Sequence, residues 1–259
     1  MKRLLLSAVL LSLAGVASAK IVTQVAEYKQ GETVCQGWVS YDDAVKGKRP
    51  AILLVHDWFG VTDHQKEQVE KLAALGYVAL AADVYGKGLR PANAQEAGAA
   101  AGTYYKDPAL LRARVRAGLD YLASLPQADP ERMAATGYCF GGKCALELAR
   151  SGAPLKAVVT FHGALTTADS TDAKNIRAKI LVLHGADDPF VKQDDVRGFM
   201  NEMRAAGVDW QLVQYSGAVH SFTDTRAGND NSKGAAYNAN ADRRSWRAMR
   251  DFLEETLAK

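Results

Sequence analysis

The chain has 259 residues, of which 48% are hydrophobic and 24% are charged, and its formal net charge is +3. These proportions exclude a disordered chain, which combines low hydrophobicity with high net charge, and also a collagen-like or low-complexity chain. Acidic and basic residues are interspersed and no basic stripe occurs, so we expect no nucleic-acid partner. The length suits one large α/β domain or two small ones.

The first 19 residues have the three parts of a secretory signal peptide. Lys2 and Arg3 are basic, residues 4–13 form an apolar segment too short to span a bilayer, and residues 17–19 (Ala-Ser-Ala) match the A-x-A cleavage pattern. An uncleaved membrane anchor is the alternative. We expect cleavage to release residues 20–259, periplasmic or secreted and without membrane contact, since no later run of about 20 apolar residues occurs.

After this segment, the apolar residues alternate between strand-like and helix-like patterns. Two strands, at 21–26 and 33–41, are joined by a Gln-Gly turn and predict a hairpin. Residues 50–57 form a continuous apolar run, which is typical of a strand buried on both faces of a parallel sheet. Further strands are predicted at 77–83, 133–138, 155–161, 179–184 and 210–215, and helices at 63–75, 91–105, 110–125, 140–150, 194–206 and 238–258.

The alternation predicts βαβ crossovers and therefore an α/β fold. We expect a mostly parallel central sheet with helices on both faces and an N-terminal hairpin. No Pro- or Ser-rich linker divides the chain, so a single domain is predicted over residues 20–259. The Gly-, Asn- and Ser-rich residues 215–237 are predicted to form a long loop.

A strand-turn-helix segment at residues 133–150 carries the clearest chemical motif. Residues 137–141, Gly-Tyr-Cys-Phe-Gly, have the spacing of the nucleophile elbow G-x-S-x-G, with Cys139 in place of serine. The glycines let the strand reverse sharply into the helix, and the helix N-terminus favours a thiolate. A phosphate-binding glycine loop and a buried structural cysteine are the alternatives, but the pattern G-x-x-x-x-G-K-[ST] is absent. We predict that Cys139 is a nucleophile.

A thiol nucleophile needs a base and a group that orients the base. In α/β-hydrolases the acid and the histidine follow the nucleophile along the chain. Asp187 and Asp188 follow one predicted strand, and His220 follows the last one. We predict His220 as the base and Asp188 as the acid, with Asp187 as the fallback; a turn aspartate and a loop histidine are the alternatives.

Residues after the first buried strand complete the predicted site. Two backbone N–H groups should hold an oxyanion, and we assign them to Phe140 and Trp58. Trp58, Phe59 and Phe222 are candidate substrate-binding side chains, with simple packing as the alternative for the aromatic pair. Asp57 would oppose ionisation of the thiol by like-charge repulsion, unless it is a surface turn residue.

Three cysteines are an odd number for an exported protein. Cys139 and Cys144 on one helix would have Cα atoms about 8–9 Å apart, beyond the reach of a disulfide. Cys35 is left as a possible partner for either.

The histidines do not have the spacing of a metal site. His56, His162 and His184 lie near predicted strand ends, but H-x-x-x-H, C-x-x-C and H-E-x-x-H are all absent. We expect no metal and no other cofactor, and we expect these three side chains to pack or hydrogen-bond beneath the site.

Five segments, in chain order, resemble the dienelactone hydrolase family: HDWFGVTDHQ, GYVALAADVYGKG, GYCFGG, HGADDPFV and GAVHSF. The resemblance covers essentially residues 20–259. It implies an α/β-hydrolase fold without a cofactor, with Cys139, His220 and Asp188 as the triad. It also implies that Asp57, where the family usually has Glu, holds the resting thiol neutral until substrate displaces it.

One departure from the family concerns the substrate. Characterised members are known to bind the substrate's carboxylate with arginines, one of them just after a His-Ser-Phe sequence. Here His220-Ser221-Phe222 is followed by Thr223 and Asp224, and an acid there would repel a carboxylate.

We therefore expect an exported hydrolase that acts on a small-molecule ester or lactone through an acyl-thioester. The alternatives are a non-catalytic exported small-molecule binding protein that keeps the hydrolase fold, and a thiol-redox role for Cys139.

Overall fold

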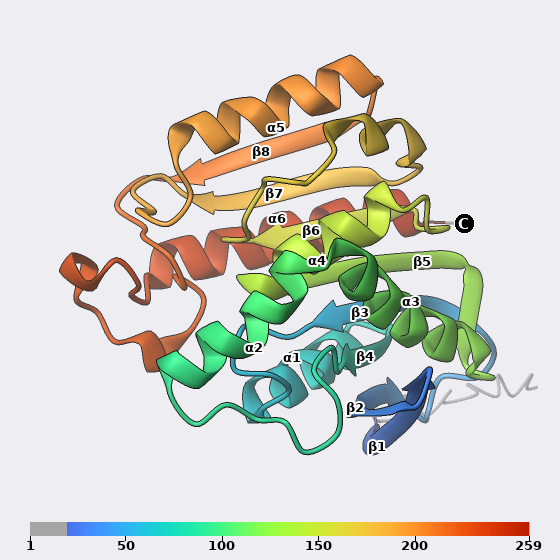
Figure 1. The fold of residues 1–259 in the computed structure, drawn as a ribbon. Coiled ribbons are helices and arrows are strands. Elements are labelled where there is room, and N and C mark those ends of the chain that lie inside the picture. Colours follow the sequence, from blue (N-terminus) through green and yellow to red (C-terminus); the bar gives the residue numbers. More distant parts are fainter. Residues whose placement is uncertain (1–19, 259) are drawn as a thin grey trace, which may run out of the picture.

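The computed structural model describes residues 20–258, and the predicted signal peptide lies outside them. Within this range eight strands form one sheet in the order β1-β2-β4-β3-β5-β6-β7-β8 (Figure 1). The strands are β1 (Ile21–Gln30), β2 (Thr33–Asp42), β3 (Arg49–Val55), β4 (Val78–Ala82), β5 (Ala128–Tyr138), β6 (Ala157–Phe161), β7 (Lys179–Gly185) and β8 (Trp210–Tyr215).

Six helices and three short 3₁₀ turns join the strands in the described part of the chain. The helices are α1 (Asp63–Ala74), α2 (Ala94–Lys106), α3 (Pro108–Ser124), α4 (Phe140–Arg150), α5 (Gln193–Ala206) and α6 (Ala239–Leu257). The 3₁₀ turns are η1 (Ser170–Asn175), η2 (Thr225–Ala227) and η3 (Asn231–Lys233). None of the helices within residues 20–258 combines the length and apolar character that crossing a membrane requires.

The predicted α/β fold with a mostly parallel sheet is confirmed. β1 and β2 form the antiparallel hairpin, and β2 runs antiparallel to β4. From β4 through β3 to β8 all neighbouring strands are parallel. Parallel strands place their carboxyl ends at one edge of the sheet, so the loops that follow β3, β5, β6, β7 and β8 meet there.

Helices cover both faces of the sheet, as Figure 1 shows. On β3, Leu53 and Val55 pack into the core beneath α3, α4 and α5, whereas Ile52 and Leu54 pack into the core beneath α1 and α6. Because successive side chains of a strand point to opposite faces, a strand covered on both sides must be apolar at every position. This explains the continuous apolar run in the sequence.

Element boundaries differ from the predictions where a capping residue, not hydrophobicity, sets them. α2 begins at Ala94 instead of residue 91, because the Asn93 side chain accepts a hydrogen bond from Glu96 N. α3 begins at Pro108, where the Asp107 side chain accepts from Leu110 N. The predicted 215–237 loop contains η2 and η3, and η1 was not predicted at all.

Candidate active site

Cys139 lies between β5 and α4 on a backbone that only a tight turn produces. Its φ is 54° and its ψ is −115°. A Cβ atom on Gly137 would lie 2.2 Å from Gly141 O, and one on Gly141 would lie 2.2 Å from Val55 O. Both positions therefore need glycine, as the sequence analysis expected for a sharp turn from strand to helix.

Three non-glycine residues in the described chain have a positive φ: Cys139, His162 and Ser221. All three lie in loops at the carboxyl edge of the sheet and line the same cavity. Such conformations cost about 1–3 kcal/mol each and persist where the surrounding structure imposes them, most often at functional sites. The three strained residues therefore indicate that the functional site lies at this edge of the sheet.

Asp188, and not Asp187, contacts His220. The distance between His220 Nδ1 and Asp188 Oδ2 is 2.8 Å, and Asp188 Oδ1 accepts a hydrogen bond from Phe190 N at 2.9 Å. Asp187 Oδ2 instead accepts from Gly217 N at 3.0 Å, which ties two loops together. The Asp188 side chain is fully buried, so its hydrogen bond to His220 is shielded from water.

Cys139 and His220 line the same cavity, and their contact affects the charge of the imidazole. Burial favours the neutral imidazole, but the negative charge of a Cys139 thiolate and hydrogen bonds to Asp188 and Cys139 outweigh it and raise the pKa of His220 to about 10. The structure thus brings Cys139, His220 and Asp188 together in the order nucleophile, base, acid.

Two buried histidines support the loops around this group. Burial lowers the pKa of His162 well below its usual value, and its Nε2 lies 2.9 Å from Thr223 Oγ1 while its ring stands edge-on to that of His220. His56 Nε2 accepts from Val84 N, so its Nδ1 donates to Asp57 O. Each imidazole therefore links two loops of the site.

His184 is also buried, and it does not line the cavity. In the described chain neither of its ring nitrogens has a hydrogen-bond partner, and burial lowers its pKa. It is a packing residue behind the site.

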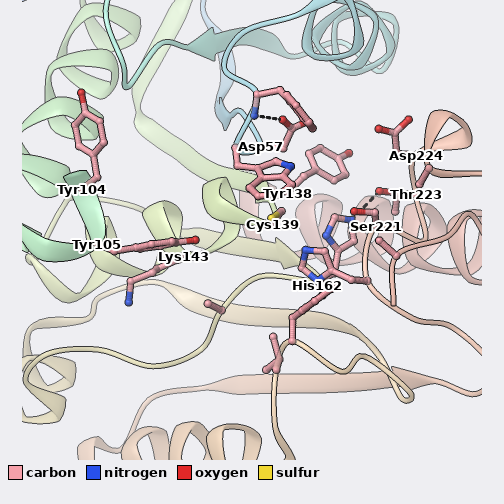
Figure 2. A pocket seen from close by; sticks show the side chains of 18 of the residues that line it. Asp57, Tyr104, Tyr105, Tyr138, Cys139, Lys143, His162, Ser221, Thr223 and Asp224 are labelled. Carbon is pink, nitrogen blue, oxygen red and sulfur yellow. Dashed lines mark hydrogen bonds between the residues drawn. The ribbon is translucent and has the colours of Figure 1, made fainter. Parts of the chain in front are cut away.

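Asp57 is held by its own loop and by helix α1. Its Oδ1 accepts from Phe59 N at 2.8 Å and its Oδ2 accepts from Gln65 Nε2 at 3.0 Å. The carboxylate also lines the cavity that contains Cys139 (Figure 2). Its predicted effect on the thiol stays a prediction, as does the alternative that Asp57 is a surface turn residue.

The predicted oxyanion donors come from two segments at the carboxyl edge of the sheet, the start of α4 and the loop after β3. Phe140 is the first residue of α4, where a backbone N–H has no acceptor within the helix. Trp58 lies in the loop after β3, and its carbonyl is fixed by a 3.0 Å hydrogen bond from the Tyr85 hydroxyl. Both positions agree with the assignment, which stays a prediction.

A cavity of about 1150 Å³ opens over Cys139. Trp58 and Phe59 line it, and Figure 2 shows Tyr105 and Lys143, from α2 and α4, on one side of the sulfur. The i, i+4 spacing of Lys143 from Cys139 was a usable signal in the sequence. Tyr105 gave no local signal, because its position depends on how α2 packs.

The sequence profile described as "Dienelactone hydrolase family" matches residues 36–257. The chain belongs to the dienelactone hydrolase family. It is accordingly a hydrolase that acts on ester or lactone bonds.

Relatives of this family member cover most of its length. A solved structure described as a dienelactone hydrolase-like promiscuous phosphotriesterase from metagenomic libraries is 42% identical, with a TM-score of 0.89 over 93% of this chain and 100% of that chain. An Escherichia coli protein named for carboxymethylenebutenolidase is 28% identical over 81% of this chain and 78% of its own. An uncharacterised Caenorhabditis elegans protein is 37% identical over 57% of this chain and 95% of its own.

In this dienelactone hydrolase, Phe222 does not contact a substrate as predicted. Its side chain is fully buried and does not line the cavity. The positive φ of Ser221 turns the chain, and Phe222 packs beneath the loop, with its ring edge-on to His162 and tilted against Tyr215. The prediction was wrong because proximity to His220 in sequence does not determine the direction of the side chain.

Asp224, which stands where characterised family members have an arginine, is neutralised by a neighbour. Arg226 Nε donates to Asp224 Oδ1 at 2.8 Å and Arg226 Nη2 donates to Asp224 Oδ2 at 3.0 Å. Both residues line the cavity. The bidentate pair satisfies both charges, so neither residue offers an unpaired charge to a ligand.

The cysteines of this family member are free thiols, and Cys35 and Cys144 are both buried. Burial raises the pKa of both thiols. Within residues 20–258 no group of three His, Cys, Asp or Glu side chains is placed to hold a metal ion.

Proposed function

We propose that this dienelactone hydrolase cleaves carboxylic esters or lactones through an acyl-thioester on Cys139, in a periplasm or outside the cell. The observation that supports it most is the contact chain from Cys139 through His220 to Asp188, with Cys139 held on a strained turn at the floor of a large cavity. The proposed export rests on residues 1–19 of the sequence.

In the proposed reaction, Cys139 attacks the carbonyl carbon as a thiolate. The backbone N–H groups of Phe140 and Trp58 stabilise the oxyanion of the tetrahedral intermediate; loss of one donor would raise the barrier by about 3–4 kcal/mol. The intermediate collapses to the thioester, and the alcohol leaves with a proton from imidazolium His220. His220 then takes a proton from water, which attacks the thioester, and the thiolate leaves.

Asp188 and Asp57 would act on this reaction through charge. Asp188 stabilises the imidazolium form of His220 and fixes which ring nitrogen faces Cys139. Asp57, with one oxygen engaged by its loop and the other by Gln65 of α1, would place a negative charge near the resting thiol and oppose its ionisation.

The solved relative described as a promiscuous phosphotriesterase bears on the choice of substrates. A phosphotriester, like a carboxylic ester, is an uncharged electrophile that a thiolate can attack. Phosphotriesters therefore belong in the substrate panel beside esters and lactones.

Intact-protein and peptide mass spectrometry after brief exposure to 4-nitrophenyl acetate tests the proposal. For the protein recovered from a bacterial periplasm, we expect a chain that begins at Lys20 and an acetyl adduct on Cys139. Cys139→Ala should lose the adduct and at least about 10³-fold of the turnover, whereas the matched variant Cys144→Ala should keep both.

Three outcomes would contradict this. Full turnover by Cys139→Ala would show that Cys139 is not the nucleophile. A mature chain that keeps residues 1–19 would show that the signal peptide is not cleaved. Binding of panel compounds without adduct or turnover would favour the non-catalytic binding protein.

A further inference from the structure

Phe190 is an aromatic side chain at the active site that the catalytic proposal does not use. At 62% it is the most exposed large apolar side chain in the described chain, and it lines the cavity over Cys139. It lies in the loop between β7 and α5, two residues after Asp188. Single exposed apolar residues are common on protein surfaces, so its position rather than its exposure carries the argument.

The loop holds the Phe190 ring against the base. Phe190 N donates to Asp188 Oδ1 at 2.9 Å, so the carboxylate that orients His220 also fixes this backbone. The ring stands edge-on to His220, with centroids 5.4 Å apart and planes at 90°. Across the loop, a Cβ atom on Gly234 would lie 2.9 Å from Pro189 Cγ and 3.1 Å from Phe190 Cζ, so the two segments are in close contact.

The chemistry of ester cleavage places one part of the substrate beside this ring. Nδ1 of His220 is bonded to Asp188, so Nε2 must deliver the proton to the leaving oxygen, at about 2.6–3.2 Å. The group attached to that oxygen therefore begins next to His220. The carbonyl oxygen points instead toward the N–H groups of Phe140 and Trp58.

The cavity-lining residues of the Phe190 segment and of the Gly234 segment are apolar, apart from Lys233. Val191 and Ala235 line the cavity with Phe190. Lys233 is largely exposed and lies 4.0 Å from Asp230. An uncharged apolar group fits this environment better than a charged one, because the charges beside it, on His220 and Asp188, already pair with each other.

We propose that Phe190 forms the binding platform for the alcohol portion of the substrate, and that the enzyme prefers esters of aromatic alcohols to esters of small alkyl alcohols. The proposal rests on the proposed function and names the substrate class of the same site. Contact between two aromatic rings is worth about a tenfold difference in kcat/KM.

A rival role for Phe190 makes a different prediction. If the ring only shielded the Asp188–His220 pair from water, its removal would change proton transfer for every ester alike. The test must therefore compare two alcohols on one acyl group.

The experiment measures kcat/KM for benzyl butanoate and methyl butanoate, whose alcohols have similar acidity. We expect the wild-type enzyme to favour the benzyl ester, and Phe190→Ala to lower its kcat/KM by about tenfold while the methyl ester changes less than about twofold. Phe190→Tyr should keep the preference. Leu89→Ala, which removes another exposed apolar side chain outside the cavity lining, is the matched control and should leave both values unchanged.

Several results would overturn the inference. Wild-type enzyme without a benzyl preference would do so, and so would an equal fall for both esters, or a shifted pH profile, in Phe190→Ala. These outcomes differ from a failure of the proposed function, which would appear as turnover retained by Cys139→Ala or as no hydrolysis of either ester by the wild-type enzyme.

Discussion

The hydrogen bond between Asp188 and His220 separates two neighbouring aspartates that look alike in the sequence. Asp188 reaches the imidazole from a fully buried position, whereas Asp187 turns outward to the backbone of Gly217. Asp188 therefore orients the imidazole, whereas its neighbour Asp187 connects two loops. The two residues allow a matched experiment.

We predict that Asp188→Asn lowers kcat for 4-nitrophenyl acetate by about 10⁴, because the amide favours the wrong imidazole tautomer and removes the charge that stabilises imidazolium. Asp187→Asn should stay within about threefold of the wild-type value. Steady-state kinetics of both variants check this. A large loss in Asp187→Asn with little change in Asp188→Asn would reverse the assignment.

The position of a single side chain could be predicted from the sequence where the local backbone determines it. It could not be predicted where packing against distant segments determines it. Cys139 and His220 could be proposed because a glycine-defined turn and the order along the chain constrain them. Phe222 could not be placed, since the positive φ of Ser221 decides its direction. Phe190 and Tyr105 gave no signal, because their place in the cavity depends on segments distant in sequence.

At the element scale, the turn from β5 into α4 depends on close backbone contact with β3. The atom that an added Cβ on Gly141 would meet is a backbone oxygen, which cannot move without shifting the strand. Gly98, inside α2, has open space around it and no such constraint. Both are helical glycines, so they form a matched pair.

We predict that Gly141→Ala lowers the free energy of unfolding by about 1–3 kcal/mol through overpacking. Gly98→Ala should raise it by about 0.5–1 kcal/mol, because alanine loses less conformational freedom in a helix than glycine does. Urea unfolding curves give both values. If Gly141→Ala left the free energy of unfolding unchanged or raised it, as expected for Gly98→Ala, the backbone at the elbow would have room for a methyl group and the prediction would be wrong.

Element positions were predicted best where sequence chemistry is local. α4 and β8 have the predicted boundaries; a glycine turn defines the start of α4. β5 begins five residues earlier than predicted, at Ala128, because residues 129–132 carry no apolar pattern and the pairing with β3 is irregular there.

At the scale of the whole molecule, the fold class could be predicted but the strand order could not. Alternating strands and helices require a parallel sheet with helices on both faces, whatever the order. The placement of β4 between β2 and β3 depends on which strands pair, and no local pattern encodes that. The cavity follows from this order, because it forms where the loops after β3 and β5 through β8 converge.

The five histidines make the free energy of unfolding depend on pH. Burial lowers the pKa of His56, His64, His162 and His184 below the ordinary value of 6.5, whereas contact with Cys139 and Asp188 raises that of His220 to about 10. Below pH 6.5 the unfolded chain binds protons at the first four positions that the folded chain does not, so folding is penalised. His220 is protonated in both states there and adds no slope; its contribution is lost only as the pH rises from 6.5 toward 10.

We therefore predict that the free energy of unfolding falls as the pH drops from about 6.5 to 5, by up to about 1.4 kcal/mol per pH unit for each histidine that stays neutral. Most carboxylates titrate below this window, so the histidines dominate it. Thermal or urea unfolding at pH 7, 6 and 5 measures the slope. His184→Phe should reduce it by up to one proton, since His184 has no hydrogen-bond partner in the described chain and its removal leaves no polar group unpaired. A pH-independent stability across this window, or a slope unchanged in His184→Phe, would mean that the folded chain admits protons at these buried rings.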